Sequence, residues 1–366
     1  MHVQLNPLVV AGIVYLTTPD QHLIAVDGSN GEEKWRFKPE RLGEKFGGLN
    51  RGLAFWASGS DSCIFYTTGT YLNAVNLRTG KYEVRFGDQG RINLSSGLVK
   101  PAEIMGISAP AAPVICGDLV IVGMMSWSSP ANVSAFDIRT GQRRWIFNTI
   151  PHPGEYGHHT WGDANFWLDG AGVNVWGGLS VDTQNNLVFF STGQPKDDFY
   201  RPNNAGQQLY GNSVIALNAS TGERKWHYQY IHHDLWDLDL PCAPIVTSLV
   251  HKGKKIPGLV QLTKTGNVLM FNRLTGEVLS DIEERSVPRS PLYGENTYPT
   301  QPYVKWPEPF SKQVVTEADL TNLNPEAHAH ALAQFRKADA GWFIPPSEKG
   351  IIYYGIQGGA EWGGGS

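Results

Sequence analysis

A short corner recurs five times along this chain, and it constrains the fold more than any other feature of the sequence. In each copy, an apolar strand runs into Asp or Asn, which is followed by a few residues, a Gly and then a large apolar residue. Internal similarity of this kind indicates one supersecondary unit that is copied along the chain. The copies are DGSNGEEKW at 27–35, NLRTGKYEV at 76–84, DIRTGQRRW at 137–145, NASTGERKW at 218–226 and NRLTGEVLS at 272–280.

The turn chemistry predicts that each corner is a tight β-hairpin. Asp and Asn accept a hydrogen bond from the backbone two residues on, and Gly supplies the positive φ that closes the turn. The entering strands, such as VSAF at 133–136, alternate with the period of a β-strand. Three repeats end in Trp, which we expect to pack between neighbouring sheets. Repeated four-stranded sheets with an aromatic plug predict an all-β β-propeller. The alternative is a β-sandwich, which has no reason to repeat its corner.

The copies are unevenly spaced, at intervals longer than the roughly 40–45 residues of a WD40 unit. We expect the additional length to be loop, and loops are where a propeller carries its function. The 41 Gly and 23 Pro agree with a fold rich in turns, and a net charge of −4 argues against nucleic acid as a partner. Apolar runs are too short for a transmembrane segment, the first residues do not resemble a signal peptide, and the three Cys are expected to be buried.

The ends of the sequence predict an incomplete ring. The chain opens almost directly in a strand and stops soon after a strand-like stretch at 350–354, whereas a closed propeller must pair its last sheet with its first. We therefore expect residues 1–366 to be a single incomplete domain of about five blades and the start of a sixth. A long, partly helical insertion is expected at about 281–345, with a helix at 324–338 that begins with Asn324 as N-cap and Pro325.

One loop concentrates chemistry. Residues 231–241, IHHDLWDLDLP, place three carboxylates, two histidines and a Trp directly after a strand. Together with LNRGLAFW at 49–56, NVWGG at 174–178 and TKTGN at 263–267, this loop resembles the quinoprotein dehydrogenases. These are eight-bladed β-propellers that use pyrroloquinoline quinone (PQQ), and the resemblance to their glucose- and alcohol-oxidising members extends in order along the chain to the Gly-rich run at 358–364.

The resemblance implies an oxidoreductase that oxidises an alcohol or sugar hydroxyl by hydride transfer to the quinone. Asp237 matches the general base, and Lys264 matches the lysine that hydrogen-bonds the reactive quinone oxygens. Trp176 matches the Trp on which the cofactor stacks, and Arg51 matches an arginine that binds a cofactor carboxylate. Without the resemblance, the four residues read as a turn cap, an exposed turn Lys, a blade-packing Trp and a solvated Arg.

Further cofactor contacts follow from the same alignment. A Thr that contacts the cofactor in the family aligns near Ser108 or Ala111, of which Ser108 is the expected contact, and Asn174 belongs to the motif of Trp176. Phe46 stands where the alcohol-oxidising type carries vicinal cysteines that cover the quinone, so it is expected to act as a lid.

The resemblance also implies a Ca²⁺ or Mg²⁺ ion that polarises the quinone through hard oxygen ligands. Asp237, Gln194 and Ser126 are the expected ligands, although the loop at 123–130 lacks the carboxylate that the family supplies there. His232 and His233 are expected to orient the Asp237 loop. A zinc site in the His-rich segment 152–163 is an alternative, but its spacing fits no common zinc pattern.

Partners and location follow only from the resemblance. Electrons are expected to pass to cytochrome c or ubiquinone, at the periplasmic or outer face of the inner membrane. The competing function is a propeller of the same ancestry that has lost its cofactor and serves as a scaffold for protein partners.

Overall fold

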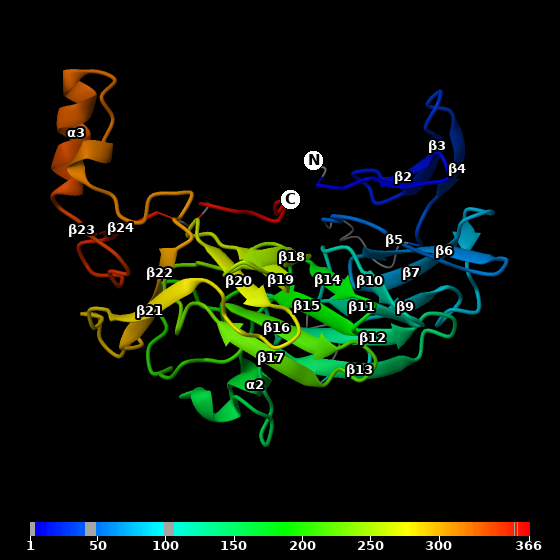
Figure 1. Ribbon diagram of the computed structural model, residues 1–366, viewed down its shortest axis with the longest axis horizontal. Helices are drawn as coiled ribbons and strands as arrows, with labels where there is room; N and C mark the ends of the chain where they lie inside the picture. The colour runs from blue at the N-terminus through cyan, green and yellow to red at the C-terminus, as the bar shows by residue number, and fades with distance from the viewer. Residues whose placement is uncertain (1–3, 41–48, 99–105, 355, 357) are drawn as a thin grey trace. The chain divides into compact units, whose positions relative to one another are not determined.

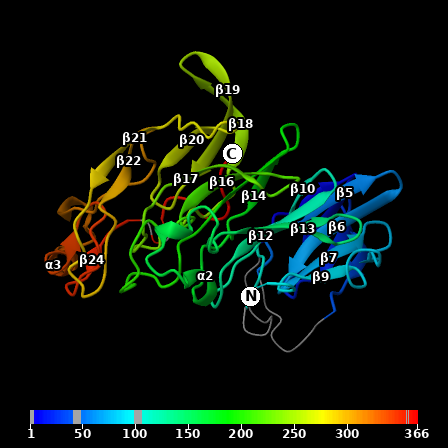
Figure 2. The same cartoon turned by 90° about the horizontal axis from the view of Figure 1, so that it is seen from below.

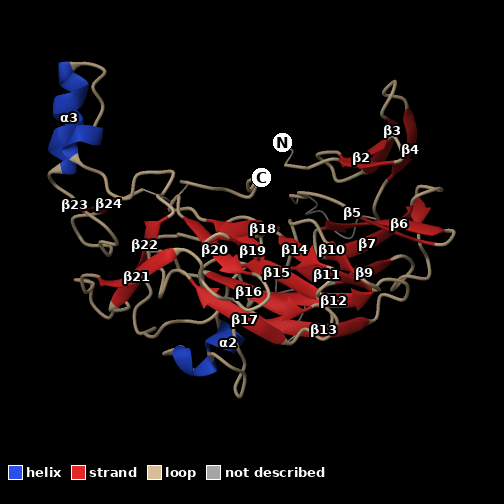
Figure 3. Ribbon diagram, viewed as in Figure 1, coloured by secondary structure: helices blue, strands red, loops and turns tan. Residues whose placement is uncertain are grey.

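Strands dominate the computed structural model, which describes residues 4–40, 49–98, 106–354, 356 and 358–366 (Figure 3). Within these residues, helical segments are short, namely η1 (His158–Thr160), α2 (Phe166–Asp169), η2 (Glu317–Asp319) and α3 (Pro325–Phe335). None of the helices in the described part of the chain combines the length and apolar content needed to cross a bilayer. The prediction of an all-β fold is confirmed.

The strands form successive sheets in chain order (Figure 1). The first sheet has the order β1-β2-β3-β4 (Leu8–Val10, Ile13–Thr17, Leu23–Asp27, Glu33–Phe37). The second contains β5 to β8 (Ala54–Ser58, Asp61–Thr68, Tyr71–Asn76, Lys81–Tyr82), with β9 (Arg91–Asn93) paired to β7. The third has the order β10-β11-β12-β13 (Val114–Cys116, Leu119–Gly123, Asn132–Asp137, Arg143–Asn148).

The later sheets are progressively smaller. A four-stranded sheet has the order β14-β15-β16-β17 (Leu179–Asp182, Leu187–Ser191, Ser213–Asn218, Arg224–Gln229), and a three-stranded one has the order β18-β19-β20 (Ile245–His251, Lys254–Leu262, Val268–Asn272). Two-stranded sheets pair β21 with β22 (Asp281–Ser286, Thr300–Trp306) and β23 with β24 (Asp339–Ala340, Ile351–Ile352). Each of the five larger sheets contains one copy of the repeated corner, as a propeller requires.

The corners have the predicted turn chemistry. In every copy, the Gly amide donates to the carbonyl of the leading Asp or Asn, as between Gly141 and Asp137 at 2.8 Å. The leading carboxylate or amide oxygen also accepts from the backbone two residues on, as from Arg139 N to Asp137 Oδ1 at 3.1 Å. All five glycines have positive φ, between 61° and 79°. The hydrogen bonds within each turn and the positive φ of its Gly therefore follow from the local sequence.

The Trp that closes a repeat packs on the Gly of the next corner along the chain. A Cβ built on Gly80, Gly222 or Gly276 would lie 2.6–2.7 Å from the indole of Trp35, Trp145 or Trp226, respectively. Each indole N–H also donates to the backbone carbonyl that follows the leading residue of that corner, as from Trp145 to Ala219 at 2.9 Å. The repeated Trp thus ties one repeat to the next.

This packing yields a prediction about the corner glycines. Gly31→Ala is expected to cost about 1 kcal/mol of unfolding free energy, because Ala must adopt a positive φ and no atom of the described residues lies within 4 Å of the new methyl group. Gly222→Ala carries the same strain and also drives its methyl group into the Trp145 ring, which adds roughly 1–3 kcal/mol. Urea denaturation of both variants checks the difference. Equal losses would mean that the ring moves aside without cost.

The described chain divides into two compact units. Unit 1 comprises Met1–Thr149, Leu168–Phe190 and Ala216–Lys225, and unit 2 comprises Ile150–Trp167, Ser191–Ile215 and Trp226–Ser366. The core of unit 1 contains clusters of buried side chains from its first three sheets, including Phe65, Leu72, Val120 and Phe136. Figure 2 shows the same sheets in a second view. Cys63, Cys116 and Cys242 are all buried, as predicted, and each is a free thiol.

The segment 281–345 contains β21, β22, η2, α3 and β23. The predicted helix is present as α3, and it ends at Phe335, three residues earlier than expected. Asn324 is its N-cap, because its side chain accepts from the Ala327 amide at 2.8 Å, and Pro325 occupies the first turn. The helix signal was local, so it could be predicted.

Candidate functional site

Arg51 and Trp176 meet in unit 1. The guanidinium carbon lies 5.2 Å from the centroid of the Trp176 ring, and Nη1 donates to the Trp176 carbonyl at 2.7 Å. Nε donates to Gln4 Oε1 at 3.0 Å, and the backbone amide donates to the Pro110 carbonyl at 2.8 Å. Trp176 itself is half-buried. A cation held over a partly open indole makes a polarised platform for a planar anionic ligand.

Ser108, Ser126 and Asn174 also come together in unit 1. Ser108 and Met125 exchange two backbone hydrogen bonds of 2.9 and 2.8 Å, and Asn174 Oδ1 accepts from the Ser126 amide at 2.9 Å. Ser126 Oγ accepts from the Ser128 amide and from the Ser129 hydroxyl, each at 3.1 Å. This arrangement gives Ser126 a role within its own loop. Phe46 lies outside the described residues.

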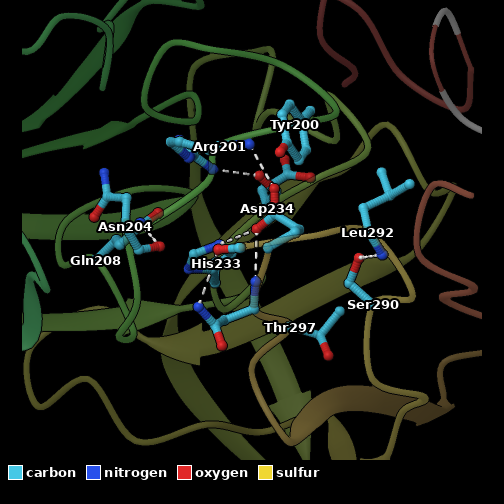
Figure 4. Close-up of polar contacts among 12 residues, drawn as sticks. Tyr200, Arg201, Asn204, Gln208, His233, Asp234, Ser290, Leu292 and Thr297 are labelled. Carbon is cyan, nitrogen blue, oxygen red and sulfur yellow. Dashed lines mark hydrogen bonds and ion pairs between the residues drawn. The ribbon is translucent and has the colours of Figure 1, made fainter.

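In unit 2, Asp234 organises the 231–241 loop from within. Its carboxylate accepts from the amides of Trp236 and Leu238, both at 2.7 Å, and from the Asn212 side chain at 2.8 Å. Burial raises the pKa of Asp234 to about 6, although hydrogen bonds from these two amides act in the opposite direction. Figure 4 shows Asp234 beside Arg201 and His233. The two bonded amides flank Asp237, so this carboxylate holds the backbone on both sides of it.

Two residues of the loop adopt the left-handed backbone conformation. His233 has φ 47° and Asp237 has φ 56°. A non-glycine residue in this region costs on the order of 1–3 kcal/mol, and the conformation persists only where the surroundings over-determine it. The hydrogen bonds of Asp234 are among the contacts that stabilise this backbone conformation. They keep Asp237 in a conformation that an unconstrained chain would rarely adopt.

Asp237 pairs with Lys264. Lys264 Nζ lies 3.2 Å from Asp237 Oδ2 and 3.1 Å from the Asp237 carbonyl, and the Lys264 side chain is only 7% exposed. Burial, followed by the charge of Asp239, raises the pKa of Asp237 to about 7 in spite of Lys264. Burial lowers the pKa of Lys264, but the charges of Asp239 and Asp237 outweigh it and raise that pKa above its ordinary value. A carboxyl group poised near neutral pH is suited to proton transfer.

Gln194 lies among further carboxylates of unit 2. Its amide N–H donates to Asp239 Oδ1 at 2.7 Å, and its side-chain Nε2 donates to Asp198 Oδ1. Its Oε1 is buried and has no hydrogen-bond partner among the residues that the structure describes. Burial and the charge of Asp239 raise the pKa of Asp198. An unsatisfied buried carbonyl oxygen is costly unless a ligand completes it, so this oxygen is a candidate cation contact.

The described residues contain no group of three or more His, Cys, Asp or Glu side chains placed to hold a metal ion. His232 and His233 have partners within unit 2, since His232 Nε2 lies 3.3 Å from Glu284 and His233 Nε2 lies 3.3 Å from Glu295. These contacts agree with a role in orienting the loop.

A pocket in unit 2 is walled by residues on either side of Asp237. Trp236 and Leu238 contribute from the loop, and Trp342, Phe343 and Tyr353 contribute from later in the chain, with Lys312 among the polar lining residues. Trp236 donates its indole N–H to the Ile344 carbonyl at 2.7 Å and accepts at its own carbonyl from the Tyr353 hydroxyl at 2.8 Å. The pocket is therefore built onto the loop that carries Asp237.

The sequence motifs did not identify Asp198, Asp239 or the aromatic wall. Asp239 was visible as the third carboxylate of the 231–241 run, two residues after Asp237. Asp198 contacts Gln194 four residues away in a loop that has no regular pattern, and Phe343 packs against Trp236, which is distant in the sequence. Only the tertiary structure reveals them.

Comparisons with known proteins cover the whole chain. The family model that matches residues 1–366 is described as "PQQ: Glucose/ethanol/alcohol dehydrogenase, beta-propeller domain". The chain is 30% identical to a quinoprotein glucose dehydrogenase of Escherichia coli K12, over 99% of this chain and 48% of that protein. It is 28% identical to a quinate/shikimate dehydrogenase (quinone) of Acinetobacter baylyi, over 98% of this chain and 48% of that protein.

Solved structures agree on the fold. A quinohemoprotein alcohol dehydrogenase from Pseudomonas putida superposes with a TM-score of 0.65 at 25% identity, over 76% of this chain and 41% of that one. A europium-containing methanol dehydrogenase gives a TM-score of 0.62 at 26% identity, over 74% of this chain and 49% of that one. The β-propeller of quinoprotein type is thereby confirmed, and the chain spans about half the length of the curated relatives that it matches.

Proposed function

The chain belongs to the β-propeller family of PQQ-dependent glucose, ethanol and alcohol dehydrogenases, and from this premise we propose that it forms part of an oxidoreductase acting on an alcohol or sugar hydroxyl. The observation that carries the proposal is the ion pair between the half-buried Asp237 and the buried Lys264, 3.2 Å apart, in a loop held in a strained conformation. Such a pair places a carboxylate that can accept a proton next to an ammonium group that can stabilise negative charge.

In the proposed reaction, Asp237 takes the proton of the substrate hydroxyl. In the cation-free protein, its pKa of about 7 leaves a substantial ionised fraction at neutral pH, and a cation bound beside it would favour the ionised form further. Lys264 orients the carboxylate through its ammonium group, and its positive charge stabilises negative charge that develops nearby. Asp234 holds the two amides that flank Asp237 and so limits where the carboxylate can move.

The residues of unit 1 are chemically suited to part of the cofactor that the family implies. PQQ is a flat tricyclic quinone with three carboxylates, and when bound it supplies the hydride acceptor. In unit 1, we assign Trp176 as the stacking surface, Arg51 as a carboxylate partner, and Ser108 and Asn174 as polar contacts. In unit 2, Lys264 is the quinone contact. The half-buried Trp176 ring with a cation fixed at 5.2 Å supports this assignment. Phe46 remains a proposed lid.

For a Ca²⁺ or Mg²⁺ ion, Asp237 and Gln194 are the proposed ligands. The unpartnered Oε1 of Gln194 supports the choice, because an amide oxygen is a ligand that hard cations accept. The carboxylate of Asp198, which Gln194 contacts, is a further oxygen donor in the same unit. Ser126 stays a predicted ligand, although its hydroxyl already accepts two hydrogen bonds.

Removal of the Gln194 amide oxygen is expected to weaken cation binding. Gln194→Ala is predicted to lower the affinity of the protein for Ca²⁺ by about tenfold, in the range of a lost ligand or supporting contact. Isothermal titration of metal-free protein measures this change. Gln261→Ala, which truncates another buried amide whose oxygen has no partner among the described residues, is the matched control and is expected to leave the affinity unchanged. Unchanged affinity in Gln194→Ala would remove Gln194 from the ligand set.

The pocket beside Asp237 is the proposed substrate site. Its aromatic walls offer apolar faces to a carbon skeleton, and Lys312 and Gln313 offer polar groups to hydroxyls. We further propose that electrons pass to cytochrome c or ubiquinone, that the protein works in the periplasm, and that residues 1–366 are one incomplete propeller domain. These assignments rest on the family alone.

Reconstitution tests the proposed function. The full-length protein is loaded with PQQ and Ca²⁺, and reduction of an artificial dye is followed with glucose, quinate and primary alcohols as substrates. Dye reduction that needs both cofactor and substrate is expected. If PQQ does not bind and no substrate reduces the dye, the scaffold function becomes the better description.

A further inference from the structure

The side chain of Gln301 contacts the backbone of the 231–241 loop at both polar groups of one residue. Gln301 lies in β22 and is fully buried. Its Oε1 accepts from the His232 amide at 2.9 Å, and its Nε2 donates to the His232 carbonyl at 2.6 Å. An amide side chain carries an acceptor oxygen and an N–H₂ donor group, so it can bind both the backbone N–H and the backbone C=O of His232, as a neighbouring β-strand would. The start of the loop is thus fixed by a residue of the 281–345 segment.

Glu295 contacts the next residue of the loop. Its Oε1 lies 3.3 Å from His233 Nε2, and both side chains are inaccessible to solvent. The other ring nitrogen of His233, Nδ1, lies 3.0 Å from the Gly206 carbonyl. Burial alone raises the pKa of Glu295, but hydrogen bonds from His233, Arg201 and Asn296 outweigh it and hold the pKa below its ordinary value. The buried carboxylate is therefore stabilised in its charged form by fixed donors.

Arg201 links Glu295 to the middle of the loop. Its backbone amide donates to Glu295 Oε2 at 2.5 Å, and its Nη2 donates to the Asp234 carbonyl at 2.6 Å. Asp234 in turn holds the amides on either side of Asp237. Figure 4 shows Arg201, His233 and Asp234 side by side. A continuous set of buried hydrogen bonds therefore runs from Glu295 to the residues that flank Asp237.

We propose that Glu295 and Gln301 are positioning residues, which hold the backbone at 232–234 so that the Asp237 carboxylate stays at Lys264. The inference rests on the proposed role of Asp237. Two positive φ values in the loop mean that its conformation needs outside contacts, and these two side chains supply contacts at its beginning. The 281–345 segment thereby influences the reaction by holding the loop that carries Asp237, although Glu295 and Gln301 do not contact the reacting groups themselves.

Gln301→Met tests the proposal, because it keeps most of the side-chain volume and removes both hydrogen bonds to His232. In the full-length protein, kcat is expected to fall by about tenfold or more, since a small displacement of a reacting group is costly in rate. The KM and the affinity for PQQ are expected to change by less than about twofold, because the substrate and cofactor contacts stay in place. Hydrogen–deuterium exchange in peptides covering 231–239 is expected to rise.

Gln261→Met is the matched control. Gln261 is equally buried, lies in β19 of the same unit and donates to the carbonyls of Cys242 and Leu262 at 3.1 and 2.8 Å. The same substitution there is expected to lower stability to a similar extent and to leave both kcat and the exchange of 231–239 unchanged. Glu295→Gln, which preserves shape and removes charge, provides a second variant should Gln301→Met fail to fold, and it is expected to shift both readouts in the same direction.

The two readouts separate this inference from the proposed function. Unchanged exchange at 231–239 in a folded Gln301→Met protein overturns the inference whatever the reaction. Raised exchange with full kcat, or an equal loss of kcat in Gln261→Met, also overturns the positioning role. If Gln301→Met raises the exchange at 231–239 but the wild-type protein shows no PQQ-dependent turnover, the contact between Gln301 and the loop is supported. In that case it is the proposed function that is overturned.

Discussion

Asp237→Asn is expected to abolish turnover while the protein still binds PQQ. The amide has nearly the shape of the carboxylate, and its oxygen can still accept from Lys264, so the loop survives and the PQQ contacts proposed at Trp176 and Arg51 are untouched. The amide cannot take a proton at neutral pH, however, whereas the carboxyl group has a pKa of about 7. Loss of a general base costs about 10²–10⁴-fold in rate. Steady-state dye reduction and cofactor titration measure the two properties separately.

Asp182→Asn is the control for this variant. Asp182 is a buried carboxylate of unit 1 that accepts from the backbone and side chain of Asn185 at 3.1 and 2.9 Å. Its substitution is expected to alter stability and leave kcat essentially intact. A variant at Asp237 that keeps a tenth or more of the wild-type turnover would assign the proton transfer to another group, and Asp239 would be the first to examine.

Trp145→Ala is expected to cause a large loss of stability. The indole is 8% exposed, packs against Gly222 and donates its N–H to the Ala219 carbonyl, so truncation leaves a cavity and an unpaired carbonyl. Replacement of a buried Trp by Ala costs about 3–5 kcal/mol. Urea denaturation followed by circular dichroism measures this loss as a shift of the midpoint.

Trp127→Ala provides the comparison, because Trp127 is 61% exposed in the same unit. Surface substitutions usually change the free energy of unfolding by no more than about 0.5 kcal/mol. Similar midpoints for the two variants would show that the repeated Trp is not what joins one repeat to the next, and the packing of the β-strands would then carry that role.

The corners and the helix were predicted well because their signals are local. The Asp137 side chain bonds the amide of Arg139, and Asn324 bonds the amide of Ala327, so each interaction lies within a few residues. Local contacts need no knowledge of which segments meet in space. The same holds for the positive φ of the corner glycines, which follows from the turn type alone.

The candidate site was predictable only in part. Its individual residues were identified through motifs that resemble a family, and the structure brings Arg51 to Trp176 in unit 1 and Asp237 to Lys264 in unit 2. The roles of Glu295 and Gln301 could not be predicted from the sequence. Their side chains contact a loop more than 60 residues away, and such contacts leave no periodic pattern or characteristic spacing in the sequence. Their neighbours in the sequence are ordinary loop and strand residues.

By itself, the sequence determined a chain of repeated hairpin corners and hence a propeller, since turn geometry and alternating strands depend on nearest neighbours. It also determined the family, through short motifs that occur in a fixed order. Only the tertiary structure decided that the corner Trp packs on the Gly of the next repeat, that burial and Asp239 raise the pKa of Asp237 to about 7, and that Gln301 secures its loop. These outcomes depend on burial and on contacts between distant segments, which exist only once the chain has folded.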